Sequence, residues 1–336
     1  MTHSTLARRG ALVAAIATSA LLLGACSSGS TTPGTGGDTD EMEIVPVTVG
    51  AVFTTAAVPL WIAEEEGIFE EYGLDVTITQ APNFAASAPS LLNGQMQFAN
   101  AATAPVITAI DQGMPLQIVA GVSAEPDDPA VGDDQVTVAA GSDITRPSDL
   151  EGKTVAVNAV GSGPYVGVMA NYLADGGTPD GINWVVMNLS EQIAALESGQ
   201  VDAAVLSEPF AGTARAQGFE AAFNAYRAND LDVIPSGFTD AVLVASTQYL
   251  AENADVAERM RNAMIDANDF AEKNPDIVRA LLVEKLELEP ASAEAAFLPA
   301  FIGAVEPDNV QAMIDAMLAV GLIESELDAT DVVWIP

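Results

Sequence analysis

The amino-acid sequence predicts a mixed α/β protein with two lobes and a helical carboxyl-terminal tail. Short apolar runs alternate with helical patterns from Val47 to Ala245, and this is the order of elements that builds parallel sheets. After Ala245 only helical patterns follow. A chain of 336 residues is long enough to form two hydrophobic cores, and it contains no repeat of the solenoid type.

The first 25 residues have the pattern of a signal peptide. Arg8 and Arg9 precede the apolar segment Ala11–Leu23, which is too short to span a bilayer. We therefore expect residues 1–25 to be removed on export. The paired arginines are compatible with the twin-arginine route as well as with the general one.

Cys26 follows the signal pattern at once and is the only cysteine of the chain, so it has no intrachain disulfide partner. The segment Leu23-Gly-Ala-Cys26 resembles the lipobox of bacterial lipoproteins. The resemblance implies cleavage before Cys26, a diacylglycerol on its thiol, and a protein anchored by lipid at the outer face of the cytoplasmic membrane. An ordinary secretory signal with an incidental cysteine is the alternative. Residues 26–46 are polar and rich in glycine, serine and threonine, which predicts a flexible tether.

The segment from Val47 to Ile78 carries a predicted strand, a loop, a helix and a second strand. The opening apolar run stops at Phe53, and the helical pattern that follows ends near Gly67. Leu74–Ile78 then alternates apolar and polar residues, as a half-buried strand does. In an open α/β sheet, the loop after the first strand lies at the edge where ligands bind.

The alternation of strands and helices continues along the chain. Residues 125–134 are rich in proline and acidic side chains, and we expect them to end the first half-domain. Later strands are predicted at residues 96–99, 116–120, 135–140, 153–157, 184–187, 202–206 and 241–245. The tail is predicted to hold helices at residues 256–274, 275–285, 291–301 and 310–320.

Charge and side-chain chemistry argue against several classes of function. The chain has 47 acidic and 11 basic residues and a net charge of −36, which repels nucleic-acid backbones. Its only histidine, His3, lies in the segment expected to be removed, and Cys26 is expected to be lipidated. The mature chain then offers no imidazole base, no thiol nucleophile and no set of His and Cys metal ligands. We therefore expect no enzyme activity, no metal and no other cofactor.

Polar and aromatic residues follow most of the predicted strands, where a ligand crevice would form. The candidate ligand-binding residues are Phe53, Thr54, Thr55, Trp61, Phe84, Ser87, Asn100, Thr103, Ser123, Ser162, Tyr165, Glu208 and Asp240. Thr103 and Ser162 are expected at helix amino ends, whose free N–H groups can donate to a ligand. Glu208 is expected to accept a hydrogen bond from an amino group or ring N–H. The structural alternatives are Trp61 as a core residue, Thr103 as a plain cap and Glu208 as a partner of a helix dipole.

The expected ligand is a neutral or cationic organic molecule, such as a heterocycle or an amine. No lysine or arginine lies in the candidate loops, so an anion would depend on helix ends and hydroxyls inside a strongly negative protein. Nitrate or a sulfonate stays open as the alternative, because helix ends alone do bind oxyanions.

Four segments stand out in order along the chain: FTTAAVPLWIAEEEGIFEEYGLDVTI, LLNGQMQFANAATAPVITAIDQGMPLQIVAG, SDLEGKTVAVNAVGSGPYVGV and LESGQVDAAVLSEPF. Together they resemble the successive signatures of ABC-transporter substrate-binding proteins of the nitrate, sulfonate, taurine and thiamine-pyrimidine-precursor type. The resemblance runs from about Val47 to Phe219 and continues more loosely to the carboxyl end.

This resemblance implies a type II periplasmic-binding-protein fold, in which a small-molecule ligand binds between two lobes. Residues 47–135 with 238–336 would form lobe 1, and residues 136–237 would form lobe 2. The resemblance also implies a monomeric receptor that hands its ligand to an ABC permease with a cytoplasmic ATPase.

Two other functional classes stay open beside the importer. A binding protein of this kind can feed a sensor, and the sequence does not separate the two roles. The resemblance also touches an enzyme branch that makes the thiamine pyrimidine with histidine and iron, but this chain lacks those histidines and the cysteine cluster. A hydrolase would need a placed pair of carboxylates, which the sequence does not show.

Overall fold

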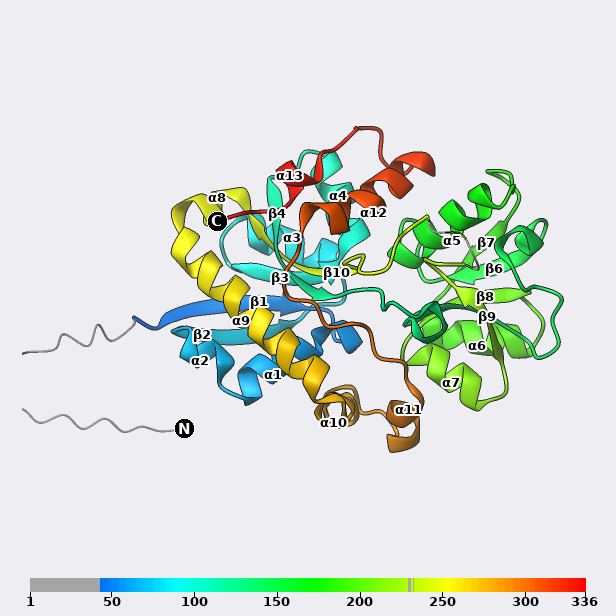
Figure 1. Ribbon diagram of the computed structural model, residues 1–336, viewed down its shortest axis with the longest axis horizontal. Coiled ribbons are helices and arrows are strands. Elements are labelled where there is room, and N and C mark those ends of the chain that lie inside the picture. Colours follow the sequence, from blue (N-terminus) through cyan, green and yellow to red (C-terminus); the bar gives the residue numbers. More distant parts are fainter. Residues whose placement is uncertain (1–42, 229–230, 232) are drawn as a thin grey trace, which may run out of the picture. The chain divides into compact units, whose positions relative to one another are not determined.

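The computed structural model describes residues 43–228, 231 and 233–336, and Figure 1 shows its elements. The predicted signal peptide, the predicted lipidation site Cys26 and residues 26–42 of the predicted tether lie outside these residues. No helix in the described part of the chain is both long and apolar enough to cross a bilayer.

The first sheet has five strands in the order β2-β1-β3-β10-β4. Its strands are β1 (Val45–Ala51), β2 (Leu74–Gln80), β3 (Phe98–Ala102), β4 (Leu116–Ser123) and β10 (Ala241–Ser246). Strand β1 pairs in parallel with β2 and β3, whereas β10 runs antiparallel between β3 and β4. The sheet is therefore completed by a strand that follows the second sheet in the sequence.

The second sheet repeats this plan with the order β7-β6-β8-β5-β9. Its strands are β5 (Asp134–Val138), β6 (Thr154–Val157), β7 (Asn183–Val186), β8 (Ala203–Ser207) and β9 (Glu220–Asn224). Strand β6 is parallel to β7 and β8, and β5 runs antiparallel between β8 and β9. Strand β9 was not predicted from the sequence, because its first two residues are exposed and it lacks a long apolar run.

Helices connect the strands and form the tail. Those between strands are α1 (Val58–Glu65), α2 (Ile68–Glu71), α3 (Phe84–Leu92), α4 (Thr103–Asp111), α5 (Gly163–Ala174), α6 (Leu189–Glu197) and α7 (Phe210–Ala216). The tail holds α8 (Thr247–Glu252), α9 (Ala254–Lys273), α10 (Pro275–Leu286), α11 (Pro290–Ala295), α12 (Pro307–Ala319) and α13 (Ala329–Val332). Helix α11 ends six residues before the predicted end at residue 301, and an irregular segment follows it.

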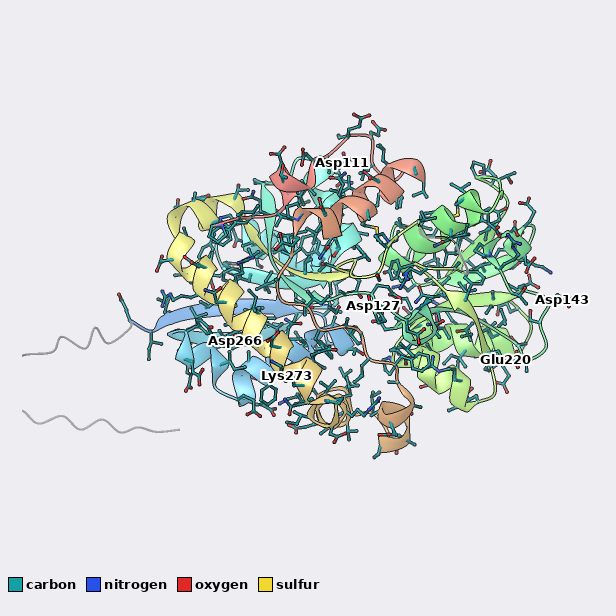
Figure 2. All side chains as sticks on the ribbon, viewed as in Figure 1. Asp111, Asp127, Asp143, Glu220, Asp266 and Lys273 are labelled. Atoms are coloured by element: carbon teal, nitrogen blue, oxygen red, sulfur yellow. The ribbon has the colours of Figure 1, made fainter. Side chains whose placement is uncertain are left out.

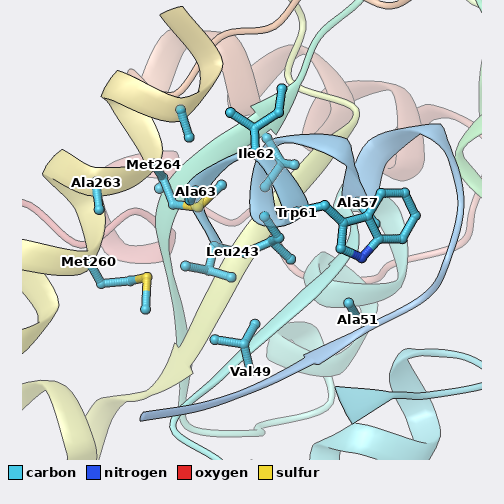
Figure 3. Close-up of a cluster of buried hydrophobic side chains, with 14 of the residues drawn as sticks. Val49, Ala51, Ala57, Trp61, Ile62, Ala63, Leu243, Met260, Ala263 and Met264 are labelled. Atoms are coloured by element: carbon cyan, nitrogen blue, oxygen red, sulfur yellow. The ribbon is translucent and has the colours of Figure 1, made fainter. Parts of the chain in front are cut away.

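The long helix α9 covers one face of the first sheet, as Figure 1 shows. Its buried residues recur at helical spacing, and Met260 and Met264 lie against the core that contains Leu243 and Ile62 (Figure 3). A helix that hides such a stripe removes apolar area from water at about 25 cal/mol per Å². Packing of this kind holds the tail on the first sheet.

Two chain crossings join the sheets, and they are hydrogen-bonded to each other. The Glu125 amide donates to the Phe238 carbonyl at 2.9 Å, and the Gly237 amide donates to the Glu125 carbonyl at 3.0 Å. The segment after α11 runs beside them, because Ala124 and Ala300 exchange backbone hydrogen bonds of 2.8 and 3.0 Å. The chain therefore passes between the sheets as a narrow group of paired segments.

Candidate functional site

A cavity of about 1010 Å³ lies where strand ends of the two sheets meet. From the first sheet it is lined by the loop after β1, by the end of β3 and by the start of α3. From the second sheet it is lined by the loop after β6, by the start of α5 and by the end of β8. The strand-end loops of both sheets therefore face one volume, as open α/β sheets place their ligand sites.

Most of the predicted binding residues line this cavity. They are Phe53, Thr54, Thr55, Phe84, Asn100, Ser162, Glu208 and Asp240. The four chain segments near residues 53, 100, 162 and 208 come together although more than 150 residues separate the first from the last. Sequence reasoning reached this arrangement because each segment follows a strand.

Trp61 and Ser87 do not line the cavity. Trp61 is only 2% exposed and lies in the first core (Figure 3), where its ring meets the edge of Phe53 at a centroid distance of 5.2 Å. Every residue from Val58 to Ala63 is buried, because α1 is enclosed by the sheet and the tail. Ser87 lies on the buried side of α3, close to Gly50 of β1. A Cβ added at Gly50 would be only 3.2 Å from the Ser87 hydroxyl oxygen. Trp61 therefore packs against Phe53 from the side of the hydrophobic core.

Thr103, Ser123 and Tyr165 also lie away from the cavity lining. Thr103 is the first residue of α4 and not its cap, and its hydroxyl donates to the Thr239 carbonyl at 2.6 Å. The Ser123 hydroxyl donates to Asp240 Oδ1 at 2.6 Å. Tyr165 packs on Trp184 with ring centroids 4.8 Å apart. Each of these side chains already has a partner within the fold.

Ser162 caps helix α5 at the edge of the cavity. Its hydroxyl oxygen accepts a hydrogen bond from the Tyr165 amide at 3.4 Å. The amino end of a helix carries a partial positive charge, so this edge of the cavity suits a polar or anionic ligand atom. Gly163 is needed there, because a Cβ at this position would be 2.5 Å from the Tyr226 hydroxyl.

Glu208 lines the cavity, and its carboxylate has two partners within the fold. Its side chain is 0% exposed and pairs with Arg215 of α7, while the Gly212 amide donates to its Oε2 at 2.9 Å. Burial raises the pKa of Glu208, and Arg215 opposes that rise by stabilising the charged form. The Glu208 carboxylate thus accepts from Arg215 and from the amino end of α7, and a ligand N–H as a further donor stays a prediction.

Three other carboxylates meet at the cavity wall. Carboxylate oxygens of Asp133, Asp134 and Asp240 lie within 4.8 Å of one another, and all three residues line the cavity. Asp133 and Asp134 precede or begin β5, and Asp240 precedes β10, so the cluster lies where the chain crosses between the sheets. Of the three, sequence reasoning named only Asp240.

The three carboxylates differ in their partners. The hydroxyl of Ser207 donates to Asp134, and that of Ser123 donates to Asp240. Asp133 is 9% exposed, and its Oδ1 has no hydrogen-bond partner among the described residues. Burial raises the pKa of Asp134 to about 7, and burial together with the neighbouring Asp134 raises the pKa of Asp133.

Glu125 adds a fourth acid behind the cluster. It is 1% exposed, Asn224 Nδ2 donates to its Oε1, and its Oε2 has no partner among the described residues. Burial and then the charge of Asp240 raise the pKa of Glu125 to about 8. Several acids are therefore held close together in a place with little water.

The lining of the cavity suits binding of an organic molecule. Phe53, Phe84 and Phe210 supply aromatic surface, and Asn100 and the acids supply polar groups. No lysine, arginine or histidine belongs to the lining formed by the described residues. Ligand sites generally combine a mostly apolar wall with a few placed polar groups, and this cavity has that composition.

Comparisons with known proteins agree with this geometry. A family model described as NMT1/THI5 like matches residues 54–277, which is more than half of the chain. The taurine-binding periplasmic protein of Escherichia coli (strain K12) is 24% identical over 244 residues, which are 72% of this chain and 66% of that protein. The chain thus spans just under two thirds of the length of that relative.

Solved structures show the same fold at low identity. The periplasmic aliphatic sulphonate binding protein SsuA from Escherichia coli has a TM-score of 0.72 at 19% identity, covering 87% of this chain and 92% of that chain. The alkanesulfonate-binding protein SsuA from Xanthomonas axonopodis pv. citri, bound to MOPS, has a TM-score of 0.69 at 19% identity. The match covers 87% of this chain and 99% of that chain. These likenesses confirm the predicted α/β fold of type II periplasmic binding proteins. With the family match over residues 54–277, the chain belongs to the NMT1/THI5-like family.

Proposed function

We propose that this protein is the solute-binding component of an ABC importer and captures a small organic molecule between two lobes. Lobe 1 is assigned to residues 47–135 with 238–336, and lobe 2 to residues 136–237. The observation that supports this most is the cavity, because its walls come from strand ends of both sheets. A ligand that touches both walls binds a closed arrangement more tightly than an open one, so its differential affinity drives closure.

The preferred ligand is a neutral or cationic heterocycle or amine. The lining formed by the described residues contains acidic side chains and no basic one. A second candidate is a sulfonate or a similar oxyanion, which the relatives that bind taurine and aliphatic sulphonates support. The amino end of α5 at Ser162 is the feature that would receive such an anion.

The proposal also covers the cellular location of the protein and the proteins with which it works. Relatives of this chain are periplasmic binding proteins. We assign this protein to the outer face of the cytoplasmic membrane as a monomer held by acylated Cys26, where it serves a permease with a cytoplasmic ATPase. Replacing Cys26 with serine should abolish incorporation of labelled palmitate and release the protein from membranes. A Cys26→Ser protein that keeps both properties would contradict the anchor.

The role of the protein in the transport cycle is binding and not catalysis. The described lining offers carboxylates, an amide and hydroxyls, but no imidazole or thiol to act as a base or nucleophile. The relatives named above are binding proteins. The solute is therefore released unchanged to the permease.

A thermal-shift screen followed by calorimetry tests the proposal. The panel holds pyrimidines, flavins, primary amines, sulfonates and nitrate. At least one class should raise the melting temperature by several degrees, because a ligand that binds only the folded state stabilises it by RT ln(1 + [L]/Kd). Substitution of a cavity residue such as Asn100→Ala should weaken that ligand, whereas Asn93→Ala on the exposed end of α3 should not. A panel without any stabilising solute would count against the proposed function.

A further inference from the structure

The acids at the crossings resemble a site for a positive charge more than a structural network. A buried carboxylate is normally paired with a cation or with enough donors to satisfy its oxygens. Glu208 in the same cavity follows that rule through Arg215. No salt bridge among the described residues involves Asp133, Asp134 or Asp240. The cluster therefore lacks the counter-charge that its neighbour has.

Asp133 provides a second and separate observation. Asp133 is 9% exposed, it lines the cavity, and its Oδ1 is buried with no hydrogen-bond partner among the described residues. A buried carboxylate oxygen without a partner costs free energy. Because Asp133 lines a ligand cavity, a donor that the ligand brings would satisfy this oxygen. Thr55 Oγ1 is likewise buried without a partner at the same cavity.

We propose that Asp133, Asp134 and Asp240 receive a primary ammonium group of the transported solute. This inference rests on the proposed function and names the chemistry that the solute carries. An ammonium nitrogen has three N–H donors, one for each carboxylate. Oxygens within 4.8 Å of one another leave their common centre no more than about 2.8 Å from each, which matches charge-assisted N–H···O bonds of about 2.7–2.9 Å.

The surroundings of the cluster favour an organic cation over a metal ion. Hard divalent ions take six or more oxygen ligands, and the described wall gives three carboxylates, while the hydroxyls of Ser123 and Ser207 already donate to them. The rest of the wall combines a few polar side chains with apolar ones, among them Phe53, Phe84 and Phe210. An amine with a carbon skeleton uses both parts of this cavity, because its charge meets the acids and its skeleton meets the aromatic rings.

Position gives the cluster a second consequence. Asp133 and Asp134 lie on one crossing between the sheets and Asp240 on the other, so an ammonium bound here ties the two crossings together. Without a cation, a negative charge on one of these carboxylates opposes ionisation of the other two, because their oxygens lie within 4.8 Å of one another. Capture of the amine therefore relieves repulsion at the point about which the lobes would move.

Matched probes test this inference. The probes are pentylamine and 2-phenylethylamine, their uncharged analogues 1-pentanol and 2-phenylethanol, tetramethylammonium, which has no N–H donor, and the chlorides of calcium and manganese. The full mature protein is titrated with each by calorimetry and thermal shift. The primary amines should bind, while the alcohols and tetramethylammonium should not. Protection by calcium or manganese without protection by any amine would overturn the inference in favour of a metal site.

Variants locate the binding. Asp133→Asn should weaken the amine by roughly 10- to 100-fold, the range for hydrogen bonds to a charged group. Asp240→Asn, which can still accept from Ser123, should show a similar loss and gives a second measurement if Asp133→Asn is poorly folded. Asp143→Asn is the control, because Asp143 is exposed on the part of the chain that carries the second sheet, outside the cavity lining (Figure 2). Equal amine affinity in all three variants would overturn the inference.

The outcome also separates this inference from the proposed function. If a sulfonate, nitrate or neutral heterocycle binds, no primary amine does, and Asp133→Asn leaves that affinity unchanged, the receptor stands and the ammonium site fails. If no solute of any class binds, both fail. If the amine binds and the two aspartate variants lose it, both are supported.

Discussion

The pairing of Glu208 with Arg215 is the residue-scale contact that most depends on its surroundings. The Glu208 side chain is fully buried, and Arg215 also donates to the Ala295 carbonyl at 3.1 Å and lies 3.9 Å from the ring centroid of Phe297. Arg215→Met should lower the free energy of unfolding by about 3–5 kcal/mol, because it leaves a buried carboxylate without its cation. Chemical denaturation measures this loss.

Two further variants serve as controls for that prediction. Adding Glu208→Gln to Arg215→Met should restore part of the stability, since no charge then stays buried. Lys273→Met, at the exposed position labelled in Figure 2, removes the pair with Asp269 and should cost only about 0.3–0.5 kcal/mol. An Arg215→Met protein that loses no more than the Lys273→Met protein would show that the pair does not carry the assigned role.

The acids near the crossings predict a pH dependence of stability. Burial raises the pKa of Glu125 to about 8 and the pKa of Asp134 to about 7, well above the values of unfolded chains. The folded protein therefore binds more protons than the unfolded one between about pH 4 and pH 8, and its free energy of unfolding should fall as the pH rises through that window. Melting curves of the ligand-free protein across this range measure the slope.

Glu125→Gln should make that slope shallower, because an amide does not titrate and can still accept from Asn224. The exposed Glu66→Gln is the matched control and should leave the slope unchanged. A wild-type stability that increases from pH 6 to pH 8, or a Glu125→Gln slope equal to that of wild type, would contradict the assignment of buried acids at the crossings.

At the scale of elements, the close approach of α5 to the segment after β9 holds the cavity wall in place. A Cβ at Gly167 would be 2.7 Å from the Ala225 carbonyl oxygen, and Asn171 Nδ2 donates to the Gly167 carbonyl at 2.8 Å and to the Tyr226 carbonyl at 2.7 Å. Gly167→Ala should destabilise by about 1–3 kcal/mol through overpacking, although alanine is the better helix former by about 1 kcal/mol. Thermal unfolding of the variant and of wild type measures this loss of stability.

The exposed Ala174→Gly, at the end of the same helix, reports helix propensity alone and should cost no more than about 1 kcal/mol. If the Gly167→Ala protein is as stable as wild type or more stable, the gain in helix propensity is at least as large as the cost of the steric clash with Ala225. The close packing of α5 would then not be required to hold Ser162 and Gly163 at the cavity.

The elements also show which parts of the site the sequence could predict. Phe53, Asn100 and Ser162 were predicted because each follows a predicted strand, and strand ends of one sheet meet at one edge; in the structure Asn100 lies within β3, near its end. Trp61 does not line the cavity, and the sequence could not show this because the first six residues of α1 are all apolar and do not indicate which face meets the sheet. Arg215 was missed although it lies only seven residues after Glu208, in the helix α7 that begins two residues after that glutamate.

At the scale of the whole molecule, the acid cluster depends on contacts between distant segments. Asp133 and Asp134 were predicted to lie in the acid-rich segment that ends the first half-domain, and only the pairing of the two crossings brings them to Asp240, more than 100 residues later. The sequence around each of these acids does not show that their side chains come together in the fold. The lobe bounds that the family resemblance implies, at residues 135 and 238, lie beside these acids, but only the structure shows that the carboxylates come together.

The most direct test of the account is a crystal structure of the mature protein bound to the solute that gives the largest thermal shift. The account predicts density for the solute inside the cavity, in contact with both walls, within hydrogen-bond distance of Asn100 or Ser162 and, for an amine, of Asp133 and Asp240. Density for the solute only outside that cavity, with Phe53 and Ser162 untouched, would contradict it.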